Sequence, residues 1–334
     1  MTKIKHIAWH VPEKEVTNND LLQEFRGLKI KELTRLTGVE SRRVAAPDET
    51  SADLAVKAAE KLFSDNNINK KQIDFIIFCT SGGDYITPAS ACVIQDRLKL
   101  SQHCGAFDFN QGCTGYLYGL ALADSLLKAG NASKVLLLTG ETIHRVIHSK
   151  DPNTQALFGD GASATLLEKS DDNNIGRFFF GTDGSKYDQI IVRHGRERHP
   201  LPESAEPDYT DAFGNIKNHA KLYMNGGTVF NFSLEKAPVL FKQLLKEENL
   251  TPDEIDHFIF HQANRIVLET LGKKLRLPAE KIIIELDDVG NTVSSSIPIS
   301  IKKSFDKGVI KKGDVVMIAG FGVGLSWGGS IIRI

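Results

Sequence analysis

Three residues whose side chains suit acyl chemistry lie in three separate turns of this 334-residue chain. Cys113 follows a β-rich apolar run and a glycine, and it precedes a helical stretch. A cysteine thiolate can act as a nucleophile and hold an acyl group. His261 ends another apolar run, and Asn291 follows a glycine in a loop of small residues. Each residue type alone is more often structural, so the interpretation depends on their combination.

The helical stretch after Cys113, residues 114–129, is apolar on nearly every side, which is typical of a buried helix. Its N-terminus would direct free main-chain N–H groups and the positive end of the helix dipole at the sulfur. Both effects favour the thiolate, the reactive form, over the thiol. Gly112 and Gly115 would let a substrate approach the main chain closely. We therefore expect Cys113 to be activated by its position.

Cysteine spacing and composition narrow the remaining classes of function. The four cysteines form no C-x-x-C pair and no zinc-like spacing with histidine, so no metal site is expected. Cys79, Cys92 and Cys104 are expected to be small buried thiols. The formal net charge of −1 gives no reason to expect nucleic acid as a partner. With no apolar run long enough to span a membrane and no signal peptide at Met1–His6, we place the chain in the cytoplasm.

The elements that must position these residues alternate between strand-like and helical patterns, which predicts an α/β fold with buried sheets. Strands are predicted at 73–79, 104–110, 135–139, 164–167, 255–260, 282–286, 315–319 and 330–334. Helices are predicted at 51–63, 89–98, 114–129, 229–248, 266–275 and 297–307.

The chain also repeats a pattern, because Asn67–Cys79 resembles Asn249–His261 about half the chain later. A duplicated α/β unit is the simplest account, with chance similarity as the alternative. We expect one half at 1–170, carrying the cysteine, and a second at 171–334, carrying the histidine and the asparagine. The segment Gly195–His219 is rich in proline, charge and histidine and is expected to be a surface loop.

Four motifs occur in a recognisable order: the cysteine turn, His261–Asn264 (HQAN), the Gly290-Asn291 loop, and the glycine turn Gly320–Gly328. The glycine turn lacks both the GK[ST] ending of a phosphate loop and the helix that follows a dinucleotide fingerprint. Together the motifs resemble the β-ketoacyl-acyl-carrier-protein synthase III family of the thiolase superfamily, over nearly the whole chain. This resemblance implies a five-layered αβαβα thiolase fold of two similar halves, and a homodimer.

The resemblance also implies a reaction, a decarboxylative Claisen condensation that either primes fatty-acid synthesis or serves a related specialised pathway. Cys113 would take the acyl group of a primer thioester, and His261 and Asn291 would donate N–H bonds to the enolate of a malonyl thioester. Main-chain N–H groups of Cys113 and Val323 would form an oxyanion hole, and Phe321 would provide an apolar wall. Coenzyme A or acyl-carrier-protein thioesters would be substrates, the carrier protein a partner, and no cofactor would be needed.

Two details of the motifs refine that expectation. Asn264 of the HQAN motif is expected to contact the substrate. The glycine turn lacks the second cysteine of biosynthetic thiolases, which favours condensation with loss of carbon dioxide. The remaining alternatives are transfer of the acyl group from Cys113 to an alcohol or amine, and a catalytically inactive thiolase-fold scaffold.

The mouth of the expected site departs from the family pattern. The residues that usually stack adenine are replaced by Glu32, Leu36 and Pro152. The basic patch for the carrier protein is thinned by Asn231 and Ile266, with Arg265 one position away. Ordinary drift is one explanation. A primer that arrives on a carrier protein or as an unusual thioester is the other.

The acyl pocket departs from the pattern as well. A bulky aromatic residue often closes the partner subunit's pocket from the position just before Pro88, and here that position is Thr87. The smaller side chain predicts room for a longer or branched acyl chain.

Overall fold

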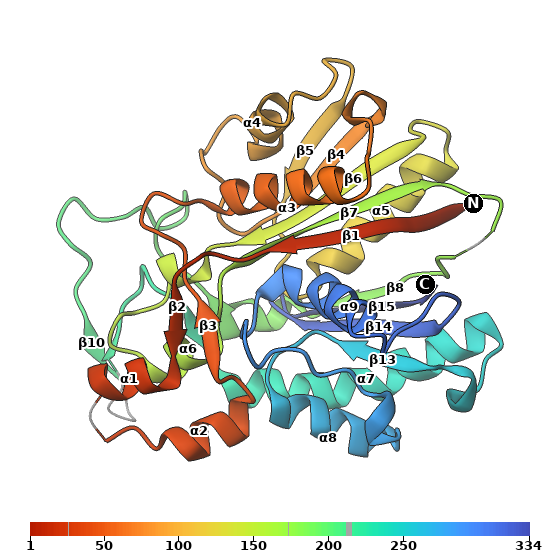
Figure 1. Cartoon of the computed structure of the whole chain (residues 1–334). Helices are drawn as coiled ribbons and strands as arrows, with labels where there is room; N and C mark the ends of the chain where they lie inside the picture. The colour runs from red at the N-terminus through yellow and green to blue at the C-terminus, as the bar shows by residue number, and fades with distance from the viewer. Residues whose placement is uncertain (26, 173, 212–215) are drawn as a thin grey trace.

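The computed structural model describes residues 1–25, 27–172, 174–211 and 216–334. Two mixed sheets lie one above the other, with helices between and outside them (Figure 1). The first sheet has the order β1-β7-β6-β4-β5, and the second has the order β13-β14-β15-β8. The first sheet contains β1 (Thr2–His10), β4 (Phe75–Cys79), β5 (Gly105–Phe109), β6 (Lys134–Glu141) and β7 (Gly161–Lys169). The second contains β8 (Phe179–Thr182), β13 (His257–Phe260), β14 (Val315–Gly322) and β15 (Ser326–Arg333).

The helices cover both outer faces of the pair of sheets and fill the space between them (Figure 1). Outside the first sheet lie α3 (Ser51–Asp65) and α4 (Ser90–Arg97). Between the sheets lie α5 (Gly115–Lys128) and α9 (Ser296–Asp306), and outside the second sheet lie α7 (Gly226–Glu248) and α8 (Arg265–Leu275). This arrangement gives the five αβαβα layers expected from the resemblance. The division into halves at residue 170 stays a prediction.

Smaller elements gather at one end of the layers, around α1 (Asn18–Glu24), α2 (Ile30–Thr37) and α6 (Pro152–Leu157) (Figure 1). The described chain also contains three two-stranded ribbons. They pair β2 (Glu15–Thr17) with β3 (Ser41–Arg43), β9 (Ile190–Ile191) with β12 (Tyr223–Met224), and β10 (Tyr209–Thr210) with β11 (Ile216–Lys217).

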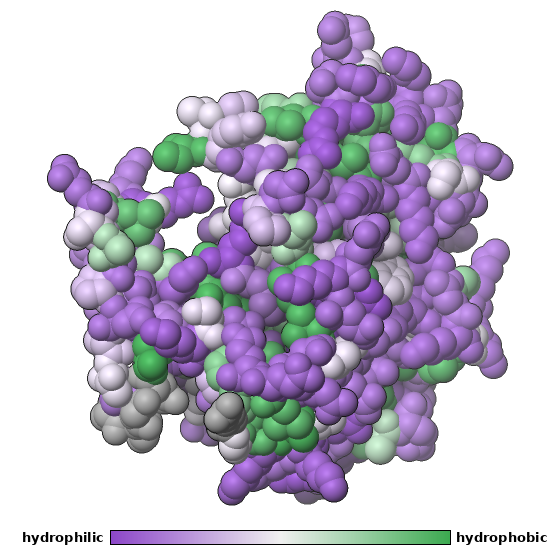
Figure 2. Space-filling view, turned by 60° about the vertical axis from the view of Figure 1, so that its left-hand side comes forward, coloured by the Kyte–Doolittle hydropathy of each residue, from purple (hydrophilic) through white to green (hydrophobic). Residues whose placement is uncertain are grey.

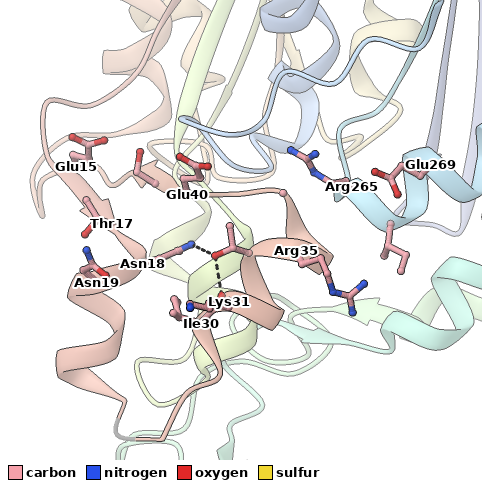
Figure 3. Close-up of a pocket in the computed structure, with 14 residues that line it drawn as sticks. Glu15, Thr17, Asn18, Asn19, Ile30, Lys31, Arg35, Glu40, Arg265 and Glu269 are labelled. Carbon is pink, nitrogen blue, oxygen red and sulfur yellow. Dashed lines mark hydrogen bonds between the residues drawn. The ribbon is translucent and has the colours of Figure 1, made fainter. Parts of the chain in front are cut away.

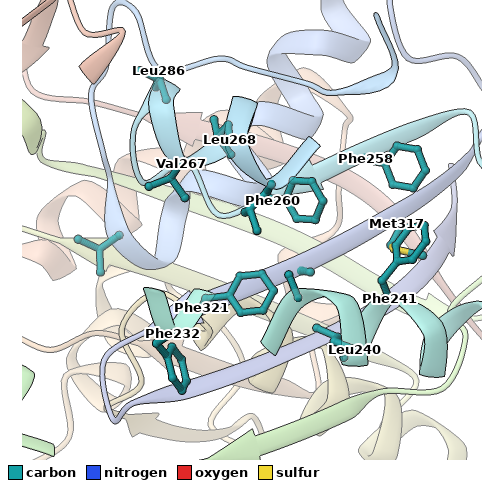
Figure 4. Close-up of a cluster of buried hydrophobic side chains, with 14 of the residues drawn as sticks. Phe232, Leu240, Phe241, Phe258, Phe260, Val267, Leu268, Leu286, Met317 and Phe321 are labelled. Atoms are coloured by element: carbon teal, nitrogen blue, oxygen red, sulfur yellow. The ribbon is translucent and has the colours of Figure 1, made fainter. Parts of the chain in front are cut away.

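The buried apolar side chains form three clusters, one on each outer face and one between the sheets. The cluster between α7, α8 and the second sheet is rich in aromatic residues, among them Phe241, Phe258 and Phe321 (Figure 4). By contrast, the outer face in Figure 2 is mostly hydrophilic, with scattered apolar side chains. The helix α5 lies in the central cluster with Tyr116 and Leu120 fully buried, which confirms the prediction of a buried helix after Cys113.

One predicted strand is wrong for a reason that the structure makes clear. Residues 282–286 lie beside β13, but only Ile282 forms a bridge, with Phe258. Beyond it, the buried Gln262 side chain donates to the carbonyl of Ile283 at 3.2 Å and accepts from the N–H of Glu285 at 2.9 Å. A side chain therefore takes the place of a neighbouring strand.

The sequence patterns missed β1, whose lysines and histidines obscure its alternation, although it pairs along its length with β7. Of the three cysteines expected to be buried, Cys79 is buried and Cys104 is half-buried, but Cys92 is exposed on α4. For Cys92 the prediction is wrong.

Candidate active site

The three residues singled out from the sequence line one cavity of about 810 Å³. Cys113 comes from the turn before α5, His261 from the end of β13, and Asn291 from the loop before α9. Asn264, Phe321 and Val323 line the same cavity. Cys113 and Asn291 are nearly 180 positions apart in the sequence. They meet in this cavity because the strands before Cys113 and His261, one from each sheet, both end beside it. The described structure brings together the nucleophile and both predicted donors, although their chemical roles stay predictions.

The glycine turn between β14 and β15 closes on the nucleophile. A Cβ atom on Gly322 would lie 2.5 Å from the sulfur of Cys113, and one on Gly320 would lie 2.8 Å from its carbonyl oxygen. No other residue type fits at either position without displacing Cys113. The turn thereby brings the main-chain N–H of Val323 to the sulfur, where the N–H of Cys113 also points. These are the two donors expected for the oxyanion hole.

Hydroxyl and amide groups fasten the cysteine turn to the glycine turn. The Gln111 amide donates to Thr114 Oγ1 at 2.9 Å and to Ser326 Oγ at 3.0 Å. The Ser326 hydroxyl in turn donates to the carbonyl of Val323 at 2.7 Å. This network joins the two halves of the chain at the reacting sulfur. None of its residues was singled out from the sequence, where the only signal was their place inside the two motifs.

The thiol of Cys113 is partly accessible from the cavity, yet its surroundings oppose ionisation. Burial raises the pKa of the thiol to about 11, despite the hydrogen bond from the Val323 N–H, and the nearby Glu141 carboxyl adds to the increase. The expectation that the helix end makes this residue a thiolate is therefore wrong for the free protein. Below about pH 10 the thiol form predominates, and ionisation must accompany substrate binding or attack.

Alkylation of Cys113 by iodoacetamide should follow this raised pKa. Because only the thiolate reacts, we expect its rate to increase about tenfold per pH unit between pH 7 and 10, without a plateau. Peptide mapping by mass spectrometry would separate Cys113 from the exposed Cys92, which serves as an internal reference. A rate that levels off near pH 8 would contradict the burial argument.

Replacing Gly322 by alanine should block acylation of Cys113. The new Cβ atom would lie 2.5 Å from the sulfur and 2.6 Å from the Cβ of Cys113, well inside van der Waals contact. Displacement of the nucleophile by about 1 Å is expected to cost roughly 100-fold in acylation rate. Gly82→Ala is the matched control, because Gly82 lines the same cavity and a Cβ there meets nothing within 4 Å. Normal acylation of the Gly322→Ala variant would refute the close contact.

His261 is buried and neutral at pH 7. Burial lowers the pKa of its imidazole to about 4, outweighing a main-chain hydrogen bond with Val293. The hydroxyl of Ser296 lies 2.7 Å from Nδ1, and the N–H of Gln262 donates to the same oxygen at 3.3 Å. A hydroxyl that donates to Nδ1 leaves the ring proton on Nε2. A neutral ring in that form is an N–H donor and adds no charge to the cavity.

The amide of Asn291 is oriented by its own loop. Its Oδ1 accepts the main-chain N–H of Val293 at 2.9 Å, and its Nδ2 has only a long contact of 3.4 Å to the carbonyl of Ala263. Gly290 adopts a φ of +68°, and a Cβ there would meet the Leu157 carbonyl at 2.9 Å, so glycine is required before Asn291. The fixed oxygen leaves the NH₂ group available to a ligand in the cavity.

The remaining predicted residues have different surroundings. Asn264 caps α8 by accepting the Val267 N–H at 2.9 Å, so only its NH₂ group remains for a substrate. Phe321 lies in the apolar cluster of Figure 4 and also lines the cavity, as an apolar wall should. Thr87 is exposed and does not line the cavity of its own chain. Its role toward a partner's acyl pocket stays a prediction.

The segment expected to be a surface loop forms one wall of the cavity. Within Gly195–His219 most described residues are exposed, but Arg196 and Leu201 line the cavity. The segment is fastened by Lys217 to Asp151 at 2.8 Å and by Asp208 to His148 at 3.0 Å. The prediction of a plain surface loop is thus incomplete, since an ion pair and a hydrogen bond hold it against the site.

A second groove, of about 930 Å³, lies between α1, α2 and the start of α8 (Figure 3). Its walls carry as many cationic as acidic side chains: Lys31, Arg35 and Arg265 against Glu15, Glu40 and Glu269. The groove therefore offers no net charge to an anionic ligand. Neither Glu32 nor Leu36 on α2, nor Pro152 at the start of α6, lines the catalytic cavity.

Comparison with known proteins gives consistent matches. The family model for 3-oxoacyl-[acyl-carrier-protein] synthase III matches residues 107–184, and the model for its C-terminal part matches residues 245–334. A β-ketoacyl-[acyl-carrier-protein] synthase III of Caldanaerobacter subterraneus is 34% identical, with 97% of this chain and 95% of that protein covered.

Solved structures agree with the sequence relatives. A 3-oxoacyl-(acyl-carrier-protein) synthase III is 41% identical with a TM-score of 0.97, covering 100% of this chain and 99% of the other. A 3-oxoacyl-(acyl-carrier protein) synthase from Burkholderia xenovorans is 34% identical with a TM-score of 0.92, covering 100% and 94%. These matches extend over the whole length of the chain.

Proposed function

The chain belongs to the 3-oxoacyl-[acyl-carrier-protein] synthase III family, and from this premise we propose how its own residues carry out the reaction. The enzyme is an acyltransferase with the thiolase fold. It condenses an acyl thioester primer with malonyl-acyl carrier protein, releases carbon dioxide and gives a 3-oxoacyl thioester, the initiating step of fatty-acid synthesis. The convergence of Cys113, His261 and Asn291 on one cavity is the observation that supports the mechanism.

In the first half-reaction the sulfur of Cys113 attacks the primer's carbonyl carbon. The thiol proton leaves, and the departing thiolate of the primer's carrier takes up a proton. The negative oxygen of the tetrahedral intermediate lies toward the N–H groups of Cys113 and Val323, which are already directed at the sulfur. The Gln111–Ser326 network fixes the turn that presents these donors.

In the second half-reaction a malonyl thioester enters the cavity and loses carbon dioxide. The resulting enolate oxygen accepts N–H bonds from neutral His261 and from Asn291, and its carbon attacks the acyl group on Cys113. The sulfur leaves as thiolate and regains a proton. A neutral imidazole suits this step, since it places no second charge near the substrate. Phe321 gives the carboxylate an apolar surface, which favours its loss.

Incubation with a primer thioester and malonyl-acyl carrier protein tests the reaction. Primer-dependent release of carbon dioxide together with a 3-oxoacyl product is the expected result. Acyl transfer to an added alcohol or amine without carbon dioxide release would instead support the acyltransferase alternative. A protein that never acquires an acyl group would fit the inactive scaffold.

We also propose that the primer arrives on a carrier protein or as an unusual thioester rather than as acetyl-coenzyme A. The support is the absence from this sequence of the usual adenine-stacking residues, with Glu32, Leu36 and Pro152 in their places. A panel of acyl-coenzyme A and acyl-carrier primers, from two carbons to longer and branched chains, tests both this proposal and the space left by Thr87. Efficient turnover with acetyl-coenzyme A would refute the first proposal, and acceptance of two-carbon primers alone would refute the second.

We further propose that the enzyme is a cytoplasmic homodimer that needs no cofactor. Strand β5 is an edge strand whose five residues are all partly exposed, and Tyr85 and Ile86 nearby are 61% and 93% exposed. An unpaired edge beside exposed apolar side chains suits pairing with a second copy. Light scattering coupled to size exclusion should give twice the chain mass. Within the described residues, no helix is both long and apolar enough to cross a membrane.

A further inference from the structure

A buried carboxyl group that the condensation does not use is bonded to Ser81 in the wall of the catalytic cavity. Glu141 is the last residue of β6 and is 1% exposed. Strands β4 and β6 are parallel neighbours, with Cys79 opposite Thr139, so the segments that follow them lie at the same edge of the sheet. The segment after β4 contains Ser81 and Gly82, which line the catalytic cavity.

The carboxyl group of Glu141 is bonded from both halves of the chain. Ser81 donates its main-chain N–H to the two oxygens at 3.3 and 3.2 Å and its hydroxyl at 2.5 Å. Ser294 donates its hydroxyl at 3.1 Å. Ser294 directly follows Val293, whose N–H orients the amide of Asn291. One side chain thus links the wall beside Cys113 to the loop that presents an enolate donor.

Among the residues that the structure describes, no hydrogen bond or ion pair joins Glu141 to a cationic side chain. Its surroundings are Cys79 at the end of β4, Cys113 before α5, Asp160 before β7, and the two serines. Burial raises the pKa of the carboxyl to about 7, although the bonds from Ser81 and Ser294 lower it. Above neutral pH the negative form predominates, and it opposes a second negative charge on Cys113.

We propose that Glu141 is a positioning residue of the condensing site, whose hydrogen bonds tie the Ser81 segment beside Cys113 to the Ser294 turn that follows the Asn291 donor. This inference rests on the proposed function. It assigns two effects to one carboxylate. Its hydrogen bonds hold the loop that positions Asn291 opposite the nucleophile, and its negative charge adds to burial in opposing ionisation of that nucleophile.

The variant Glu141→Gln removes the charge and keeps the shape and one acceptor oxygen, but its NH₂ group cannot accept a hydrogen bond, so the link between Ser81 and Ser294 is weakened as well. Alkylation of Cys113 at pH 8.5 should become roughly three- to tenfold faster, since one neighbouring charge in a protein interior is worth about half to one pKa unit. Glu168→Gln, the same substitution on the adjacent strand β7 where Glu168 pairs with Lys3 and Lys5, should leave alkylation unchanged. An unchanged rate in Glu141→Gln would overturn the proposal.

The hydrogen-bonding effect is tested with Ser294→Ala, which removes a single hydroxyl and remains usable if Glu141→Gln does not fold. Carbon dioxide release from malonyl-acyl carrier protein should fall several-fold while acylation of Cys113 by the primer keeps its rate. Combined with Glu141→Gln, the two losses should be less than multiplicative, since both act through one link. Equal loss of both half-reactions, or multiplicative losses, would indicate a merely structural residue and refute the inference.

Acylation of the wild-type enzyme shows whether a negative result counts against this inference or against the proposed function. If primer thioesters never acylate wild-type Cys113, the proposed function fails whatever Glu141 does. If wild-type Cys113 is acylated and the variants behave as their controls, only the role of Glu141 is wrong.

Discussion

Replacing Cys113 by alanine is expected to stop formation of the 3-oxoacyl product, by at least roughly 10⁴-fold, because no other described thiol lines the cavity. Decarboxylation of malonyl-acyl carrier protein should remain measurable in this variant. His261 and Asn291 keep their hydrogen bonds to Ser296 and Val293, so the enolate donors stay in place. Product by mass spectrometry and released carbon dioxide would be measured on the same samples.

Cys92→Ala is the control, since Cys92 is an exposed thiol on α4. Its loss should change neither the amount of 3-oxoacyl product nor the release of carbon dioxide. Product formation by the Cys113→Ala variant at more than about a hundredth of the wild-type rate would contradict an acyl group carried on this sulfur.

Replacing His261 by alanine is expected to impair decarboxylation and leave acylation of Cys113 intact, the reverse of the Cys113→Ala variant. Loss of one preorganised donor to a developing oxyanion typically costs 10²–10³-fold, so decarboxylation and condensation should fall by about that factor. Acylation of Cys113 should continue, because its oxyanion donors are the main-chain N–H groups of Cys113 and Val323. Quenched-flow acylation and carbon dioxide release would measure the two steps.

His103→Ala serves as the matched control on an exposed histidine. The wild-type decarboxylation rate should also show no histidine titration between pH 5 and 8, because the pKa of His261 is lowered to about 4 and the ring stays neutral throughout. Loss of acylation in the His261→Ala variant, equal to the loss of decarboxylation, would show that the imidazole acts on the thiol instead.

Local sequence patterns predicted the parts of the fold that depend on local chemistry. The apolar helix after Cys113 could be recognised because a helix without a polar face must be buried between other layers, and α5 is. The order of the motifs around His261, Asn291 and Gly322 pointed to the cavity that they line or enclose. Strand β1 was not predicted, because it lies at the edge of the first sheet and its charged and apolar residues alternate irregularly.

Features that depend on the final packing could not be predicted in this way. The helix end suggested a thiolate at Cys113, but burial raises the pKa of the thiol and Glu141, 28 positions later in the sequence, adds to the increase. Neither effect is visible in a local pattern. The apolar run 282–286 reads as a strand, yet the side chain of Gln262 takes the bonds that a strand would need. Likewise, the charged segment Gly195–His219 is held beside the cavity by contacts from Lys217 to Asp151 and from Asp208 to His148, which no local pattern reveals.

Intact-protein mass spectrometry of the enzyme, mixed with acyl-coenzyme A and acyl-carrier primers in separate reactions, tests the central claim most directly. We expect one acyl group per chain, placed on Cys113 by peptide mapping and discharged when malonyl-acyl carrier protein is added. An acyl group on another residue, or one on Cys113 that malonyl-acyl carrier protein does not remove, would contradict condensation through this sulfur.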